Sequence, residues 1–354
     1  MVDFSCTPYL GFKWSYSIRG SVASSTSRSL QSDPPECHLA AMCCELQGFE
    51  ASTFARSTLH ALFDIAGAIV SSSAHLFLED AAYPILKWFA GSVSAHGALI
   101  SSFNHHDYSS FESALQQTLC DGKQPIILCD SICSGCWQIA PLRRYIDVLQ
   151  DSEGILIVDD THAFGILGHE PDNTCPYGYG GGGVGQWIGL TTPRLVTVAS
   201  LAKAFGVPIA AISGSSGIIQ KIESSGGARL HCSPPSIVDF DMAEAAFQQN
   251  QQIGDVRRAA LYSRVVEFRE GIGQIGITSL GGFLPAQYLR FGASTRYIHA
   301  KLLSDGYHTL LVGTETSSGE AIVVLIRSDH SSEDLDGLTQ ALDNAICSAG
   351  AQPL

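Results

Sequence analysis

The sequence alternates short apolar runs with stretches in which apolar residues recur three and four positions apart. Helical spacing of this kind is seen in YSSFESALQQTL (108–119) and IAPLRRYIDVLQ (139–150). A run that is apolar at almost every position is typical of a strand buried on both faces. The runs are HLFLED (75–80), QPIILCDSI (124–132), GILIVDD (154–160), RLVTVAS (194–200) and AAISGS (210–215). The alternation predicts an α/β fold with a mostly parallel sheet covered by helices.

The pattern changes after Pro234-Pro235. A long helix is predicted over roughly Asp239 to Glu270, followed by strands near AQYLRF (286–291) and AIVVLIRS (321–328). A closing helix should begin after Ser331, with Asp334 as its capping-box partner.

These features predict three parts of the chain. We expect an N-terminal segment (1–45), a large domain (46–238), and a linker helix with a small α+β C-terminal domain (239–354). The glycine-rich stretch GYGGGGVG (178–185) within the large domain predicts a mobile loop.

Composition limits the classes of function. The chain has 354 residues, of which 45% are hydrophobic and 15% charged, so it can bury a sizeable core. A formal net charge of −14 without a concentrated basic run argues against nucleic-acid binding. The sequence has no apolar stretch of bilayer length and no secretory signal pattern at its start, so we expect no membrane association and a cytoplasmic location.

Eleven cysteines without regular spacing predict reduced thiols rather than a disulfide framework. The stretch CDSICSGC brings Cys129, Cys133 and Cys136 near one another in sequence. A zinc site would require a second cysteine pair or histidines at ligand spacing, and none follows. The local sequence therefore predicts no metal site.

Polar residues that end two of the predicted strands point to a cofactor. Asp159 ends the run ILIVD, and His162 follows in the next turn; Lys203 comes three residues after Ser200, which ends the run LVTVAS. Ligands of open α/β sheets bind at the carboxyl ends of the strands. A lysine among apolar neighbours is desolvated, and desolvation lowers its pKa toward the range in which the amine is a nucleophile. Together, a lysine for an aldehyde, a carboxylate for a pyridine nitrogen and a hydroxyl for a phosphate indicate pyridoxal phosphate, although a lone lysine in such a turn is commonly a surface residue.

Four motifs together resemble the α-oxoamine synthases. This family, which includes 8-amino-7-oxononanoate synthases and 2-amino-3-ketobutyrate CoA ligases, belongs to the class I/II aminotransferase superfamily of fold-type I pyridoxal phosphate enzymes. The motifs are DFSCTPYLGF (3–12), HHDYSSFESAL (105–115), IAPLRRYIDVLQDSEGILIVDDTHAFGILG (139–168) and SLAKAFG (200–206).

The resemblance implies a role for each residue at the site. Lys203 would form the Schiff base and shuttle the proton at the substrate Cα, Asp159 would pair with the pyridinium nitrogen, and His162 would hydrogen-bond the ring hydroxyl. Asp160 is expected to make a structural hydrogen bond. The phosphate would be held by Ser200 and by the helix start at Ser57, Thr58 and Leu59. Ser134 would line the site, and His231 and Ser233 would reach the phosphate or substrate across a dimer interface.

The departures of the chain from the family pattern include two positions expected at the site. Pro84 stands where the synthases stack a histidine on the cofactor ring, so Tyr83 beside it is the expected stacking residue. Gly313 stands where they carry an arginine for the substrate carboxylate, and Arg327 is the expected substitute.

The resemblance thus implies a homodimeric transferase that condenses an amino acid with an acyl thioester carried by coenzyme A or an acyl-carrier protein. Two alternatives stay open. One is an aminotransferase, or a lyase or replacement enzyme, that uses the same cofactor. The other is a non-catalytic relative that binds a partner through the pocket that holds the cofactor in the enzymes.

Overall fold

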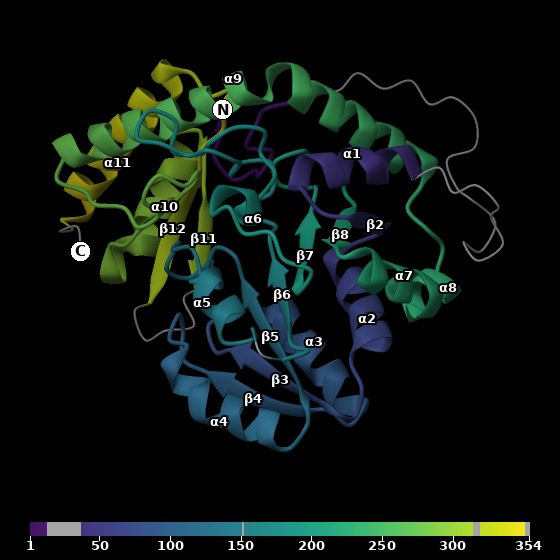
Figure 1. Cartoon of the computed structure of the whole chain (residues 1–354). Coiled ribbons are helices and arrows are strands. Elements are labelled where there is room, and N and C mark those ends of the chain that lie inside the picture. The colour runs from purple at the N-terminus through teal and green to yellow at the C-terminus, as the bar shows by residue number, and fades with distance from the viewer. Residues whose placement is uncertain (13–36, 151, 314–318, 351–354) are drawn as a thin grey trace.

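A seven-stranded sheet forms the centre of the computed structural model (Figure 1), which describes residues 1–12, 37–150, 152–313 and 319–350. In spatial order its strands are β2 (Ala51–Ala55), β8 (Ala210–Gly214), β7 (Leu195–Ser200), β6 (Ile155–Asp159), β5 (Gln124–Asp130), β3 (Ala74–Glu79) and β4 (Leu99–Phe103). Strand β8 runs antiparallel to both of its neighbours, and the other pairs are parallel. The mostly parallel sheet that the apolar runs predicted is confirmed.

Helices cover both faces of this sheet, as Figure 1 shows. Along β6, Ile155 and Ile157 pack on one face, and Leu156 and Val158 pack on the other. Because both faces are buried, the strand is apolar at each of these positions. The first face is covered by α2 (Thr58–Ile69), α3 (Pro84–Ala95) and α7 (Ser216–Ser225), and the second by α1 (Cys37–Gln47), α4 (Ser109–Cys120), α5 (Leu142–Asp147) and α9 (Ile237–Gln274).

The C-terminal part contains a separate antiparallel sheet. Its strand order is β11 (Leu310–Gly313), β12 (Glu320–Leu325) and β9 (Ala286–Leu289). The 38-residue α9 contacts both α1 and α11 (Ser332–Ala349) and so connects the two parts. The other helical elements are α6 (Val184–Trp187), α8 (Gly227–His231), the 3-10 turn η2 (Gly292–Ser294) and α10 (Thr295–Ser304).

The helix starts follow the local capping chemistry. Helix α11 begins directly after Ser331, and the capping box with Asp334 is present as predicted. Helix α9 begins two residues before the predicted start, because Ser236 and Asp239 form a second capping box there.

The N-terminal residues pack on the C-terminal part. Strand β1 (Val2–Asp3) pairs in parallel with β10 (Tyr307–His308), and Ser328 N–H donates to the Tyr9 carbonyl at 2.9 Å. Residues 13–36 of the expected N-terminal segment lie outside the described part. The division into 1–45, 46–238 and 239–354 remains our proposal.

The glycine-rich stretch 178–185 is packed and hydrogen-bonded, so the prediction of a mobile loop was wrong. Gly165 N–H donates to the Gly181 carbonyl at 2.8 Å, and Val184 N–H donates to the buried Asp160 carboxylate at 3.2 Å. A side chain at Gly168 would collide with the Tyr179 carbonyl. The glycines therefore permit close approach of two backbone segments. The structural hydrogen bond expected of Asp160 is confirmed.

Two further observations bear on the sequence-based expectations. All eleven cysteines are free thiols. Within the described ranges, no helix combines the length and the apolar character that a bilayer crossing requires.

Candidate functional site

The carboxyl ends of β5, β6 and β7 bring three polar residues to one edge of the sheet. Asp130, Asp159 and Ser200 are the last residues of these strands, and Asp130 and Asp159 are paired across β5 and β6. The turn after β6 carries His162, and the turn after β7 carries Lys203. Because β6 and β7 are parallel neighbours, Asp159, His162 and Lys203 lie at the same edge. Burial dominates the pKa of Asp159 and of His162; the Lys203 charge opposes the increase at Asp159 and adds to the decrease at His162.

Asp159 is a buried carboxyl group. Asp159 is only 8% exposed, and its Oδ1 atom accepts a hydrogen bond from Thr161 N–H at 3.0 Å. Burial raises the pKa of Asp159, whereas the Thr161 bonds and the Lys203 charge oppose the increase. A carboxylate in this position needs a cationic or N–H partner.

His162 presents an unpaired ring nitrogen at the same site. Among the described residues, none forms a hydrogen bond with its buried Nδ1 atom. Burial lowers the pKa of His162 to about 3, and the Lys203 charge contributes to the decrease. The Trp137 ring packs edge-to-face against the imidazole, with centroids 5.0 Å apart. The neutral imidazole is therefore held in place with a nitrogen available to a ligand.

Lys203 lies among buried apolar neighbours. It is half-buried, and the side chains of Leu201, Ala204 and Phe205 around it in sequence are buried. Desolvation lowers the pKa of Lys203, while the Asp159 charge raises it. A lowered pKa increases the fraction of neutral amine, which is the nucleophilic form.

Thr161 links the two turns and was not identified from the sequence. Its hydroxyl accepts a hydrogen bond from Ser200 N–H at 3.0 Å, and its own N–H binds Asp159. The Ser200 hydroxyl accepts from Ala202 N–H at 3.3 Å. Thr161 thus fixes Asp159 relative to Ser200.

Asp130 was also missed. Its Oδ2 atom accepts a hydrogen bond from Tyr83 N–H at 2.8 Å. Burial and the Asp159 charge raise its pKa. The two runs QPIILCD and ILIVD both end in aspartate, and that shared ending could have identified it. Tyr83 caps α3, whose first residue is Pro84, and Tyr83 is 50% exposed.

The predicted phosphate loop forms the start of α2. Ser57 is the N-cap residue, and its hydroxyl contacts His60 Nδ1 at 2.9 Å. Thr58 is half-buried, and Leu59 is 46% exposed. The helix start itself is confirmed, and the phosphate contact stays a prediction.

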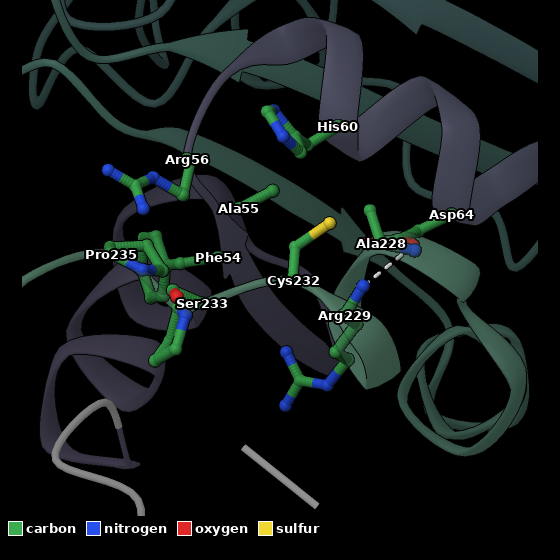
Figure 2. Close-up of a pocket in the computed structure, with 11 residues that line it drawn as sticks. Phe54, Ala55, Arg56, His60, Asp64, Ala228, Arg229, Cys232, Ser233 and Pro235 are labelled. Atoms are coloured by element: carbon green, nitrogen blue, oxygen red, sulfur yellow. Dashed lines mark hydrogen bonds between the residues drawn. The ribbon is translucent and has the colours of Figure 1, made fainter. Parts of the chain in front are cut away.

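A pocket separates this loop from the segment HCSPPS (Figure 2). Arg56, His60 and Ser233 are among the residues that line it, and Asp64 on its wall accepts a hydrogen bond from Ala228 N–H at 2.7 Å. His231 is exposed at the end of α8 and is not among the lining residues. The structure therefore places Ser233 beside the predicted phosphate loop.

Arg327, the residue predicted to bind the substrate carboxylate, already has hydrogen-bond partners within the chain. The Arg327 guanidinium donates to Asp329 Oδ1 at 2.9 Å and to the Asp3 carbonyl at 3.0 Å. Gly313 ends β11 and is exposed. Ser134 is half-buried in the loop after β5. The substrate contact of Arg327 and the place of Ser134 in the cofactor site stay predictions.

The sequence is similar to a known protein family and to proteins of known name. The family described as aminotransferase class I and II matches residues 88–311. The 8-amino-7-oxononanoate synthase of Cupriavidus necator is 27% identical over 257 residues, which are 70% of this chain and 60% of that protein. The synthase of the same name from Thioalkalivibrio sulfidiphilus is 26% identical over 293 residues, which are 80% and 69% of the two chains. The matched part thus spans about three fifths of the Cupriavidus protein.

Solved structures share the fold. Serine palmitoyltransferase of S. paucimobilis, solved with PLP and myriocin bound, has a TM-score of 0.85 at 13% identity, over 99% of this chain and 88% of that one. The 8-amino-7-oxononanoate synthase of Francisella tularensis has a TM-score of 0.74 at 15% identity, over 98% of both chains. The fold class expected from the α-oxoamine synthase motifs is confirmed.

The pKa of His162 predicts a change in stability with pH. In the unfolded chain the imidazole has its ordinary pKa of 6.5, whereas in the folded chain the pKa is about 3. Between these values only the unfolded state binds the proton, so falling pH favours unfolding. When the pH is lowered from about 7 to about 5, we expect the free energy of unfolding of the cofactor-free chain to fall more than that of the His162→Gln variant. Urea denaturation measures this, and equal losses would contradict it.

Proposed function

The chain belongs to the aminotransferase class I and II family, and on this premise we propose that it is a pyridoxal phosphate-dependent transferase that condenses an amino acid with an acyl thioester. The observation that carries the proposal is that the parallel neighbours β6 and β7 bring Asp159, His162 and Lys203 to one edge of the sheet. Support for the condensation comes from the curated relatives, which are named 8-amino-7-oxononanoate synthases.

The polar groups at this edge match the cofactor. Pyridoxal phosphate supplies an aldehyde that bonds to amines and a protonated pyridine ring that withdraws electrons from the reacting carbon. The buried Asp159 carboxylate would pair with the ring N–H, and the unpaired His162 Nδ1 would bind a polar group on the ring. Tyr83 would stack on the ring face. The buried His162 Nδ1 atom, which has no partner among the described residues, would thereby gain one.

Lys203 would hold the cofactor covalently and then move a proton. Its lowered pKa leaves more of the amine neutral near physiological pH, so it can take the proton from the substrate Cα. Asp159 carries the negative charge that stabilises the ammonium formed by this transfer. The same ammonium can return the proton to the product.

The helix start at Ser57, Thr58 and Leu59 would hold the phosphate, together with the Ser200 hydroxyl. The first N–H groups of α2 and its dipole favour an anion there. Arg56 adds a positive charge beside this helix start, and Ser233 lies across the pocket.

The substrate side is less like that of the synthases. Arg327, His231 and Ser233 are the proposed contacts of the amino acid and of the acyl thioester, which coenzyme A or an acyl-carrier protein would carry, and Ser134 would line the cofactor site. Pro84 and Gly313 replace the histidine and arginine that the resemblance implies. These two substitutions favour, as a second candidate, an aminotransferase, lyase or replacement reaction on the same cofactor.

We also propose a homodimer in the cytoplasm. The exposed fractions of Leu59, Phe63 and Trp88 are 46%, 52% and 65%, and these residues lie on the neighbouring helices α2 and α3. Large apolar side chains exposed together are typical of an interaction surface. Tyr83, at the start of α3, is 50% exposed beside them in sequence. A second copy would cover these residues next to the proposed cofactor.

The dimer predicts that a charge at Trp88 weakens self-association. Trp88→Glu would place a carboxylate in the interface, so we expect at least about a tenfold increase in the dimer dissociation constant. Sedimentation velocity over a concentration series measures this. The matched control is Tyr297→Glu, which places the same charge at the exposed Tyr297 of α10. Equal effects of the two variants would contradict the proposed interface.

Covalent attachment of the cofactor tests the proposed function. The full chain incubated with pyridoxal phosphate should gain a visible absorption band, and borohydride reduction should leave the cofactor on the peptide that contains Lys203. Lys203→Ala should lack both signals, whereas Lys221→Ala, at an exposed lysine of α7, should retain them. A chain that gains no band, or one labelled equally in both variants, would contradict the proposal.

The reaction is distinguished with the loaded chain, single amino acids and an acyl-coenzyme A. Condensation releases free coenzyme A thiol only when both substrates are present. Transamination instead forms a keto acid without any thioester, and that result would replace the first candidate with the second.

A further inference from the structure

Three potential metal ligands meet beside the candidate site, although they come from two distant segments. His105 and His106 follow β4, and Cys136 lies in the loop after β5. One ligand atom from each lies within 4.8 Å of the others, and His105 Nε2 is 3.0 Å from Cys136 Sγ. We propose that this His-His-Cys site binds a divalent transition-metal ion of the Zn²⁺ class.

The order of the strands explains why these segments meet. Strand β3 lies between β5 and β4, and all three strands are parallel. The loops after β4 and β5 therefore extend over the end of β3, where Glu79 is the last residue. His106 has a φ of 55°, in the left-handed region, so the backbone turns sharply there. The two adjacent imidazole rings consequently lie together, with centroids 3.7 Å apart.

The donor set matches Zn²⁺ better than Mg²⁺ or Ca²⁺. Imidazole nitrogen and thiolate sulfur are preferred by Zn²⁺ and its neighbours among the transition metals, whereas Mg²⁺ and Ca²⁺ prefer oxygen. Three protein ligands leave a fourth tetrahedral position for water or a carboxylate.

Glu79 supports the two histidines. Its Oε1 atom is 3.3 Å from His105 Nδ1 and 3.9 Å from His106 Nε2, and it accepts a hydrogen bond from His106 N–H at 2.7 Å. A carboxylate behind a histidine fixes the ring and strengthens the metal bond made by the other nitrogen. Because His105 Nδ1 faces Glu79, its Nε2 atom is left to bind the ion beside Cys136.

An unpaired ring nitrogen indicates that this cluster lacks a partner. In the described part of the chain, His106 Nε2 is buried without a hydrogen bond. Glu79 is 1% exposed, so its negative charge is enclosed next to these rings. A cation bound by the histidines would compensate for both costs.

The site would hold a loop that contacts the candidate active site. Cys136 directly precedes Trp137, which has a φ of 57° and packs its ring against His162. A bulky residue in this region of backbone space is strained, so something must hold it. A metal at Cys136 would fix this backbone and thereby position Trp137. The metal site is independent of the proposed reaction, because its ligands take no part in that reaction.

Cobalt titration of the full chain tests the site. Co²⁺ replaces Zn²⁺ and gives a thiolate charge-transfer band and visible bands when it is tetrahedral. We expect one Co²⁺ per chain, displaced by Zn²⁺, with the charge-transfer band absent in Cys136→Ser. His106→Gln retains the thiol, so it should bind Co²⁺ with at least about tenfold lower affinity, and Glu79→Gln should show a similar loss.

Matched controls separate this result from adventitious thiol binding and from misfolding. Cys120→Ser removes an exposed thiol at the end of α4 and should bind Co²⁺ like the unaltered chain, and so should Lys203→Ala. Circular dichroism verifies that each variant is folded. The proposal is overturned if the unaltered chain binds no stoichiometric Co²⁺, or if folded Cys136→Ser and folded His106→Gln both retain the full spectrum.

Discussion

The electrostatic attraction between the Asp159 carboxylate and the Lys203 ammonium is the interaction on which the site depends. Desolvation disfavours the charged form of both groups: it raises the pKa of Asp159 at the end of β6 and lowers the pKa of Lys203 in the turn after β7. Each group lowers the cost of burying the other. Thr161 fixes this arrangement, because it binds both Asp159 and the end of β7. The parallel sheet is what places the two turns at the same edge.

The sequence predicted the central strands and the principal site residues for a clear physical reason. Strands such as β6 are buried on both faces, so their side chains form an unbroken apolar run, and a buried strand that ends in Asp159 is conspicuous. Strands β2 and β4 were missed, since ASTFA and LISSF contain hydroxyl residues and β4 is largely exposed at the sheet edge. The glycines at 178–185 were misinterpreted, because glycine permits both mobility and close packing, and the sequence does not show the approaching backbone.

Contacts between distant segments account for what the sequence did not predict. Thr161 acts through a hydrogen bond to another strand end, and Asp130 acts through the backbone of Tyr83. The prediction of no metal site from the sequence did not include His105 for the same reason, because 31 residues separate it from Cys136. Ligand spacing along the sequence is local, whereas the strand order brings together two loops that are distant in the sequence. The proposed metal site and the proposed cofactor site therefore share one edge of the sheet.

A crystal structure of the full chain with pyridoxal phosphate is the most direct measurement. Our interpretation predicts continuous density between the cofactor and Lys203 Nζ, with the ring nitrogen within about 3.2 Å of an Asp159 carboxylate oxygen and His162 beside the ring. Cofactor density at another lysine, or an Asp159 side chain that faces away from the ring nitrogen, would contradict it.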